Sequence, residues 1–413
     1  MNDENIDKSI ISGSKTGVLP LARTGHAYRT LIGYEFLSAG DAVCWLIGLE
    51  NTGLSFYPDK NMIAGMPGNS GDFDILICIR RFDRETQMEQ YRTLTLKLTI
   101  EDDFNLQFED VDEDDPYWKP DEDTKAIQVN FSKRDRLKKD MAAASLRGLK
   151  HYKGGKIRED DFCIRYDREN RWYVLAVADG SSRAMYSRRG SKIACENSVN
   201  HCLEQLSDQS QTLRNITVAY RRKKKESIIR ELSERLFDII ASSVTYAHED
   251  IVAEAKRLNN RLDDYETTLL MCVCKKFEFG WLIGSFAAGD GAICLFDKEN
   301  WYANLLGGIE NDSENIFLTA PEVVQPIELE NRIRFSVVED FTALIVMTRG
   351  VSVPKFGSAN NLPCFELWNK LWNDISSQLD FTGKIERIGE QLLKWLGFWA
   401  PGKYDDRTIA AVF

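Results

Sequence analysis

Acidic residues stand at the ends of apolar runs in the second half of this 413-residue sequence. Glu159 and Asp160 precede the run FCIRY, and Asp179 follows YVLAVA. Asp290 follows GWLIGSFAA, and Asp405 and Asp406 precede TIAAVF. Each one alone is an ordinary turn residue. Gathered at one edge of a sheet, however, their hard carboxylate oxygens would suit Mg²⁺ or Mn²⁺. The pattern therefore makes a divalent-metal site the first hypothesis for chemistry.

Other catalytic patterns are absent from the sequence. It contains no phosphate-binding G-x-x-x-x-G-K-[ST] loop, no dinucleotide glycine fingerprint after a strand and no G-x-S-x-G elbow. The four histidines, His26, His151, His201 and His248, have no companion cysteine or serine at a recognisable spacing. We expect each histidine to be structural or on the surface.

Composition narrows the class of protein. The formal net charge is −11, from 53 Lys and Arg against 64 Asp and Glu, which argues against general binding to nucleic acid or anionic membranes. The basic run at 221–225 is predicted to be a solvated loop before a helix. No apolar run approaches the roughly 20 residues of a membrane-spanning helix, and the N-terminus lacks the apolar core of a secretion signal.

Cysteine usage points to a reducing compartment. The nine cysteines are scattered, odd in number and never spaced C-x-x-C. We therefore expect no structural zinc and no disulfide framework, and we predict a cytoplasmic location.

The first part of the chain is predicted to be a flexible tail, 1–17, followed by a β-rich domain of unknown role, 18–108. Residues 91–100 alternate Leu and Ile with Thr and Lys, the period of a half-buried strand. Residues 42–50 and 73–82 are denser apolar runs and indicate more buried strands. We expect a small all-β sandwich.

An acidic stretch follows the β-rich region. Residues 109–123 hold nine carboxylates, one lysine and two prolines, and blocks of like charge repel and stay extended. We interpret 109–140 as an acidic linker and connecting segment, with metal binding by the carboxylates as the alternative.

The pattern changes to alternating strands and helices from residue 141 onward. Helices are expected at 187–206, at 225–262 (as two helices) and at 385–402. Strands are expected at 171–179, 266–274, 279–290, within 333–350, and at the C-terminus.

Six segments in order resemble the metal-dependent protein phosphatase family of PP2C type, in its bacterial branch. They are ASLRGLKHYKGGKIREDDF, VLAVADGSSRAMYSRRGSKIA, ETTLL, AAGDGAI, DFTALIVMTRGVSVPKF and FWAPGKYDDRTIA. The resemblance implies an α+β fold over 141–413, in which two stacked β-sheets carry helices on both outer faces, a four-layer α/β-β/α sandwich.

The resemblance also implies a site. Members of the family hold a pair of Mg²⁺ or Mn²⁺ ions between the sheets, and the ions activate a water that attacks phosphoserine or phosphothreonine. The matching metal-ligand positions in this sequence are Glu159, Asp160, Asp179, the Gly180 carbonyl and Asp405, with Asp406 beside the last of them and Asp264 as an outer ligand.

Two ligand positions of that pattern are lost. Where the family writes T-D-G-V-S-D, this chain has arginine at Arg349 and valine at Val353. At about 4 Å and an effective dielectric near 20, a divalent ion facing a guanidinium would be repelled by about 8 kcal/mol. We therefore expect at least one metal site to be empty, with the Arg349 guanidinium between Asp179 and Asp405.

Two other placements of the arginine remain open. Arg349 could point outward and leave a partial site for one ion. It could instead bind a phosphate, with Arg183 of the changed loop after Gly180 as a second candidate, because guanidinium forks fit phosphate oxygens.

Two functions follow from these alternatives. The first is a catalytically impaired pseudophosphatase that binds a protein partner, such as a phosphoprotein or a protein kinase, in phosphorylation signalling. The second is an active Mg²⁺- or Mn²⁺-dependent protein serine/threonine phosphatase with a remodelled site. A third, weaker idea places the specific function in the N-terminal β domain.

Overall fold

The chain folds into two compact units, Met1–Gln107 and Phe108–Phe413. The computed structural model describes residues 16–33, 36–38, 40–83, 88–101, 123–131, 138–153, 157–218, 225–307, 316–379, 387–398, 400 and 403–413. Most of the predicted N-terminal tail, the acidic stretch up to residue 122 and residues 221–224 of the basic run lie outside this description.

The described part of the first unit is β-rich, as predicted, with one 3₁₀ turn at Pro58–Lys60. One sheet has the order β1-β8-β7-β4, with β2 also paired to β8, and a second has the order β3-β6-β5. The strands of the first sheet are β1 (Thr16–Val18), β2 (Ala22–Arg23), β4 (Asp41–Ile47), β7 (Gly71–Asp83) and β8 (Met88–Glu101). Those of the second are β3 (Tyr28–Leu31), β5 (Leu54–Tyr57) and β6 (Met62–Gly65).

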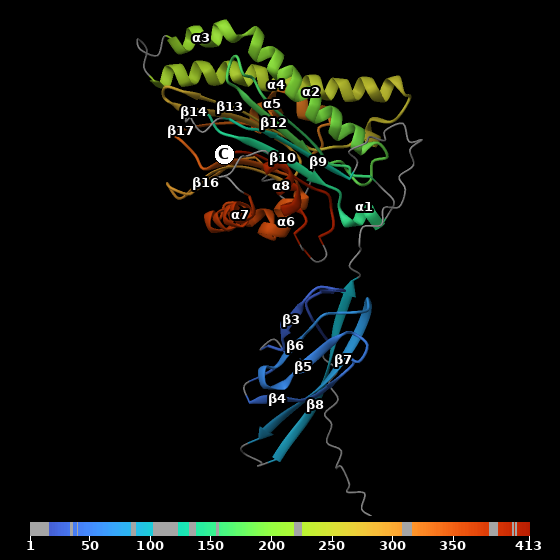
Figure 1. The fold of residues 1–413 in the computed structure, drawn as a ribbon. Coiled ribbons are helices and arrows are strands. Elements are labelled where there is room, and N and C mark those ends of the chain that lie inside the picture. The colour runs from blue at the N-terminus through green and yellow to red at the C-terminus, as the bar shows by residue number, and fades with distance from the viewer. Residues whose placement is uncertain are drawn as a thin grey trace, which may run out of the picture. The chain divides into compact units, whose positions relative to one another are not determined.

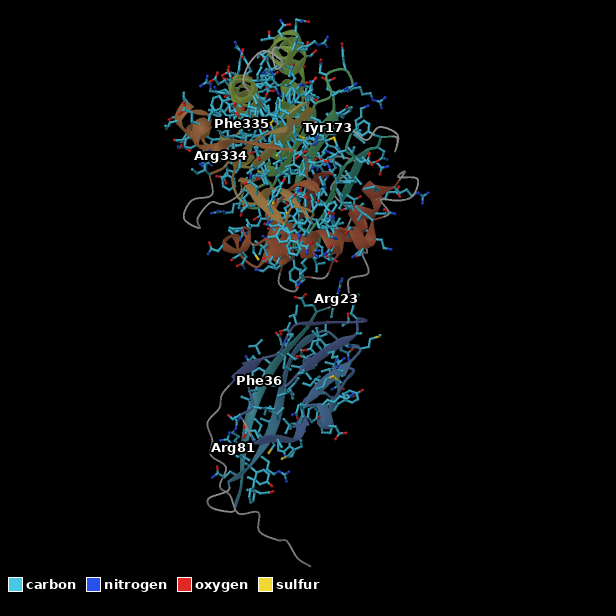
Figure 2. The ribbon with its side chains drawn as sticks, turned by 90° about the vertical axis from the view of Figure 1, so that its left-hand side faces the viewer. Arg23, Phe36, Arg81, Tyr173, Arg334 and Phe335 are labelled. Carbon is cyan, nitrogen blue, oxygen red and sulfur yellow. The ribbon has the colours of Figure 1, made fainter. Side chains whose placement is uncertain are left out.

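The alternation in β8 explains the core of this unit. Leu94, Leu96 and Leu98 are buried, and they join side chains of both sheets in one apolar cluster. Period-two patterning of this kind buries one face of a strand and leaves the other accessible. Phe36 packs against the same cluster (Figure 2). Arg81 of β7 forms an ion pair of 2.7 Å with Asp41 of β4.

The second unit contains one sheet of five strands and one of six among the described residues. One has the order β11-β12-β13-β14-β17, built from β11 (Asp161–Tyr166), β12 (Tyr173–Ala178), β13 (Leu269–Phe277), β14 (Gly280–Ala288) and β17 (Ile333–Val338). The other has the order β16-β15-β18-β19-β10-β9, built from β9 (Thr124–Val129), β10 (Met141–Leu146), β15 (Ala292–Asp297), β16 (Tyr302–Gly307), β18 (Ala343–Met347) and β19 (Arg407–Val412).

Helices cover the outer face of each sheet (Figure 1). The first sheet carries α2 (Ser187–Asp208), α3 (Ser210–Val218), α4 (Lys225–Arg257) and α5 (Pro326–Arg332). The second carries α6 (Arg349–Phe356), α7 (Phe365–Gln378) and α8 (Ile388–Leu396). A short helix, α1 (Leu149–Lys153), follows β10. The predicted four-layer arrangement is therefore confirmed.

Burial on both faces explains why the central strands are continuously apolar. In β12, Leu175 and Val177 point into the cluster between the two sheets, whereas Val174 and Ala176 point into the cluster under α2 and α4. Both faces of the strand must be apolar, so periodicity alone could not assign its orientation.

The expectation of two helices over 225–262 was wrong, and two other segments contain more strands than expected. Residues 225–257 form the single helix α4, which contains no glycine or proline, and only a 3₁₀ turn at Leu262–Tyr265 follows. The polar Ser243 within this helix donates its hydroxyl to the Ile239 carbonyl one turn earlier, at 2.6 Å. The apolar run within 333–350 is two strands in different sheets, and residues 124–129 of the presumed connecting segment form strand β9.

None of the described helices is long and apolar enough to cross a membrane. All nine cysteines are free thiols, seven of them buried.

Candidate functional site

The predicted acids meet because several strands end at the same place. Asp160 precedes β11, and Asp179 follows β12, which pairs antiparallel with β11 so that Asp161 lies opposite Ala178. In the second sheet, β18 ends at Met347, which lies opposite Ile409 of β19. Strand β19 begins directly after Asp406. The turn acids of both sheets are thereby brought to one end of the sandwich.

Asp160 is buried at the centre of this group. One of its carboxylate oxygens, Oδ2, accepts hydrogen bonds from the hydroxyls of Thr348, at 2.8 Å, and Thr408, at 2.7 Å. Burial raises the pKa of Asp160 well above its ordinary value, and the negative charges of Asp406 and Asp405 raise it further. Among the described residues, the donors to its carboxylate are these two neutral hydroxyls.

Asp406 has the opposite environment. Its two oxygens accept the backbone amides of Gly148 and Glu159, each at 2.6 Å, that of Asp160 at 3.2 Å, and a ring nitrogen of His151 at 2.8 Å. Burial alone would raise its pKa, but these donors and the imidazolium charge hold the pKa of Asp406 below its usual value. Asp406 therefore ties loops together and offers no open oxygen.

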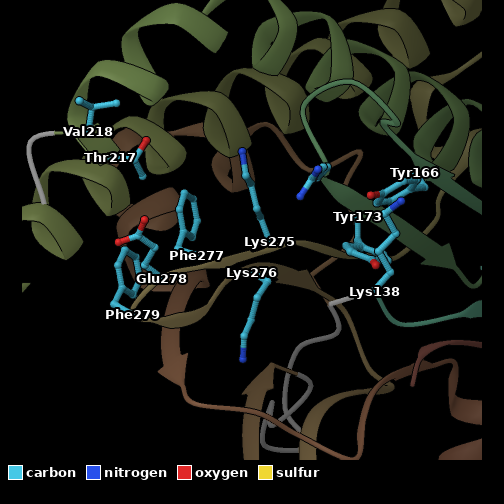
Figure 3. Close-up of a pocket in the computed structure, with 11 residues that line it drawn as sticks. Lys138, Tyr166, Tyr173, Thr217, Val218, Lys275, Lys276, Phe277, Glu278 and Phe279 are labelled. Atoms are coloured by element: carbon cyan, nitrogen blue, oxygen red, sulfur yellow. The ribbon is translucent and has the colours of Figure 1, made fainter. Parts of the chain in front are cut away.

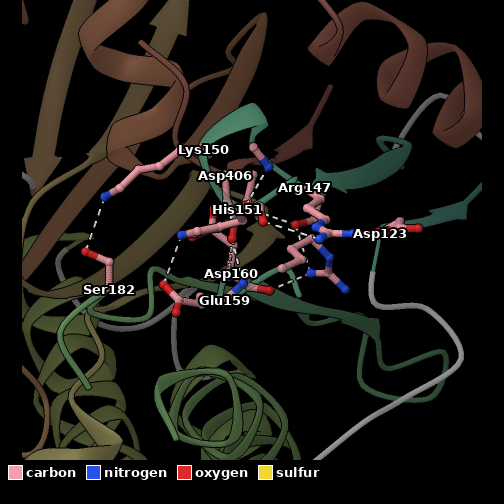
Figure 4. A network of polar contacts seen from close by, with 12 residues as sticks. Asp123, Arg147, Lys150, His151, Glu159, Asp160, Ser182 and Asp406 are labelled. Atoms are coloured by element: carbon pink, nitrogen blue, oxygen red, sulfur yellow. Dashed lines mark hydrogen bonds and ion pairs between the residues drawn. The ribbon is translucent and has the colours of Figure 1, made fainter. Parts of the chain in front are cut away.

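His151 is the main residue of the site that the sequence did not assign to it. Its buried ring lies between two carboxylates, with Nδ1 2.8 Å from Asp406 and Nε2 3.2 Å from Glu159 (Figure 4). Burial would lower its pKa, but the hydrogen bonds and charges of the two acids raise the pKa of His151 to about 10. The ring is thus an imidazolium whose single positive charge is shared by Asp406 and Glu159. The expectation of a structural histidine holds, with this added charge role.

Arg158 also supports the acidic loop. It is fully buried and donates to the Ser145 hydroxyl, at 2.9 Å, and to the carbonyl of Asp160. The sequence offered one signal, an arginine directly before the acidic pair, but nothing in the sequence indicated that it is buried.

The glycines of three matched segments are required by close backbone contacts. A Cβ atom on Gly148 would lie 2.3 Å from the backbone of Asp405, and one on Gly180 would lie 2.8 Å from the Glu159 carbonyl oxygen. A Cβ atom on Gly350 would lie only 1.7 Å from the Asp406 carbonyl oxygen. These approaches hold the acid-bearing loops together.

Asp179 is fixed by its backbone and left open at its side chain. Its amide donates to the Thr268 hydroxyl at 2.8 Å, and its carbonyl accepts the Thr268 amide at 2.9 Å. Burial raises the pKa of the Asp179 carboxyl well above its usual value, and the charges of Asp160, Asp405 and Asp290 add to this effect.

Arg349 does not lie where the charge argument placed it. Its guanidinium pairs with Asp290 at 3.4 Å, and just over half of its side chain is exposed. It forms no ion pair with Asp179 or Asp405, so it does not replace an ion between them. Val353 lies one turn further along α6 and is half-buried.

Two predicted residues are not drawn into the acidic group. Asp264 lies in the 3₁₀ turn before β13, where its carbonyl accepts a hydrogen bond from the Tyr186 amide. The negative charge of its carboxylate contributes to a raised pKa of Arg261. Arg183 is exposed and makes no hydrogen bond or ion pair with the part of the chain that the structure describes.

The donors that remain do not fit a pair of metal ions. Asp160, Asp179 and Asp405 form no ion pair with any described residue, and their oxygens are of the type that Mg²⁺ and Mn²⁺ prefer. Over the described ranges, however, no three His, Cys, Asp or Glu side chains converge closely enough to hold an ion.

The contrast between Asp179 and Asp406 gives a testable prediction. In metal-free buffer, Asp179→Asn should raise the free energy of unfolding by about 1 kcal/mol, since it removes a repelled, partly desolvated charge. Asp406→Asn should lower it by about 2 kcal/mol, since the imidazolium of His151 loses its closest anion. Urea unfolding followed by tryptophan fluorescence measures both, and equal effects of the two isosteric changes would contradict this assignment.

Comparisons with known proteins agree with the fold. Residues 147–397, more than half of the chain, match the family model described as Protein phosphatase 2C. A search of curated protein sequences found no match. Among solved structures, the serine-threonine phosphatase 2C of Toxoplasma gondii is 13% identical, with a TM-score of 0.45, over 70% of this chain and 99% of that one.

Two further structures show the same low identity. The serine/threonine phosphatase of S. agalactiae is 15% identical, with a TM-score of 0.37, over 70% of this chain and 98% of that one. RsbX in complex with magnesium is 14% identical, with a TM-score of 0.34, over 70% and 99% of the two chains. The predicted family is confirmed by the match of the family model: the chain belongs to the protein phosphatase 2C family.

Proposed function

We propose that this protein is a catalytically impaired member of its family, which binds a protein partner in phosphorylation signalling in the cytoplasm. Phosphatases of the family act on phosphoproteins with Mg²⁺ or Mn²⁺. The partner would be a phosphoprotein or a protein kinase.

One observation carries this proposal: the T-D-G-V-S-D positions contribute no carboxylate to the site. Arg349 instead places a fixed positive charge 3.4 Å from Asp290, another acid of the site. Two-metal catalysis needs ligands that hold both ions against a shared water, and neither Arg349 nor Val353 can ligate a cation. The exposed guanidinium of Arg349 remains a candidate for binding a phosphate group of the partner, together with Arg183.

A second candidate function has its own support. Asp160, Asp179 and Asp405 have no cationic partner among the described residues, and Arg349 pairs with Asp290 instead of with them. A single Mg²⁺ or Mn²⁺ on these acids would supply Lewis-acid chemistry. This arrangement supports an active phosphatase with a remodelled site.

Titration calorimetry with Mn²⁺, beside turnover of a generic aryl phosphate, tests the proposal. We expect no turnover and no binding of two ions. Binding with turnover that is abolished in Asp179→Asn would overturn the proposal and establish the active phosphatase.

Restoring the lost ligands is the complementary test. Arg349→Asp combined with Val353→Asp should increase Mn²⁺ affinity at least tenfold, because it removes a fixed cation and returns two oxygen ligands. Arg183→Asp serves as the matched control, since it changes charge on an exposed loop without returning a ligand. If the double variant binds no more Mn²⁺ than wild type, the loop is wrongly matched to the family pattern.

A further inference from the structure

A second candidate site lies at the opposite end of the first sheet. Asp179 follows β12 and Thr268 precedes β13, whereas a pocket of about 550 Å³ lies beside the other ends of these strands, at Tyr173 and Phe277. With about 3.3 Å per strand residue, this pocket is roughly 20 Å from the acidic group. Its volume is in the range of about 300–1,000 Å³ that small-molecule sites occupy.

Aromatic rings form much of the pocket wall. Phe277 and Phe279 are stacked, with ring centroids 5.0 Å apart and planes 7° apart. Tyr166 and Tyr173 line the pocket from the opposite face of the sheet, with centroids 4.7 Å apart (Figure 3). The ring of Phe277, which lies on the same face as Lys275, suits a planar aromatic group that can stack on it.

The charged groups of the pocket are mostly cations. Apart from Lys276, whose side chain lies on the other side of the strand, the lining contains three basic residues and one acid, Glu278. Lys275 is half-buried, and its ammonium stands 5.1 Å from the ring centre of Trp172 and 5.2 Å from that of Phe277. Neither Lys275 nor Arg171 has a side-chain hydrogen bond or ion pair with any residue that the structure describes. Arg171 is exposed and Lys275 is half-buried, so an anion that enters the pocket can reach both cations.

We propose that this pocket binds a small aromatic anion of the nucleotide class, with its ring stacked on the Phe277 side and its phosphate oxygens on Lys275 and Arg171. The volume of about 550 Å³ favours a small molecule over an extended peptide. The cations disfavour a positively charged ligand. Stacking on the rings of Phe277 and Phe279 should make a phosphate that carries a base bind more tightly than one that does not. This site is independent of the acidic group and of the proposed loss of catalysis.

The titration of Lys275 gives the site a pH dependence. Burial lowers the pKa of Lys275 to about 8; the nearby charge of Asp167 raises it, and those of Arg171 and Arg214 lower it further. Glu278 is the remaining acid of the lining. A bound anion would favour the ammonium form, so nucleotide affinity should fall as the pH rises from 7 to 9.

The experiment uses the full chain in EDTA, which removes any metal-bridged nucleotide from the acidic group. ATP, GTP, adenosine and tripolyphosphate are titrated calorimetrically into wild type and into two variants. Lys275→Gln should weaken nucleotide binding at least tenfold. Lys276→Gln is the matched control, because this neighbouring side chain points to the other side of the strand and donates to the Glu339 carbonyl (Figure 3); it should change affinity less than twofold.

Three results would overturn the proposal. The first is that neither ATP nor GTP binds. The second is that tripolyphosphate binds as tightly as the nucleotides, because the aromatic rings would then contribute nothing to binding. The third is a labelled phosphopeptide that competes better than nucleotide and depends on Lys275, which would make the pocket a peptide site. Asp179→Asn should retain nucleotide binding, so failure here and failure of the proposed function are separable.

Discussion

Replacing His151 by glutamine should lower the free energy of unfolding at pH 7 by about 3–5 kcal/mol, the cost of breaking a buried ion pair. The imidazolium is held between Asp406 and Glu159, and the neutral amide of glutamine would leave both acids without their shared cation. Urea unfolding, followed by tryptophan fluorescence, measures the change, because most tryptophans lie in the second unit.

The sign of the pH dependence follows from the raised pKa. The pKa of His151 is about 10 in the fold and about 6.5 in an unfolded chain. Its contribution is therefore complete below pH 6.5 and is lost as the pH rises through 10. The difference in stability between wild type and His151→Gln should shrink over this interval. His201→Gln is the control, since His201 is only half-buried and stacks on Tyr246; a difference that stays constant with pH would contradict the charged state of His151.

The acidic group could be predicted from the sequence because its chemistry is local. Glu159, Asp160, Asp179 and Asp405 are each adjacent to an apolar strand, and antiparallel pairing brings such strand ends together. The order of the six family segments then fixed the two-sheet fold. These inferences needed only the identity of residues and their position relative to a strand.

Pairing between distant side chains could not be predicted in this way. The contact of Arg349 with Asp290 depends on which way a long side chain turns, and spacing carries no information about that choice. His151 lay close to Glu159 in the sequence, but its role depends on Asp406, 255 residues later. The basic pocket was missed for the same reason, since Arg171 and Lys275 meet only after β12 and β13 pair.

Gly350→Ala should destabilise the second unit by about 3 kcal/mol or more, at the upper end of the cost of overpacking. A methyl group here would lie 1.7 Å from the Asp406 carbonyl oxygen, so the start of α6 and the loop before β19 must separate. Thr348, two residues earlier, would then lose its contacts with Asp160 and with the amide of Thr408.

The matched control is Gly389→Ala in α8, where an added methyl group would meet backbone atoms only at 3.4 Å, an ordinary contact. Alanine is the better helix former, so this change should be neutral or stabilising by up to about 1 kcal/mol. Equal stability of the two variants would show that the backbones at Gly350 and Asp406 can separate at little cost in free energy.

A large effect of Gly350→Ala would separate two requirements within one segment. Gly350 is needed for the approach of two backbones, whereas a carboxylate at position 349 would be needed only for a metal ion. This chain keeps the glycine and has lost the carboxylate. That combination is expected if the shape of the site, and not its catalytic metal pair, is what the protein uses.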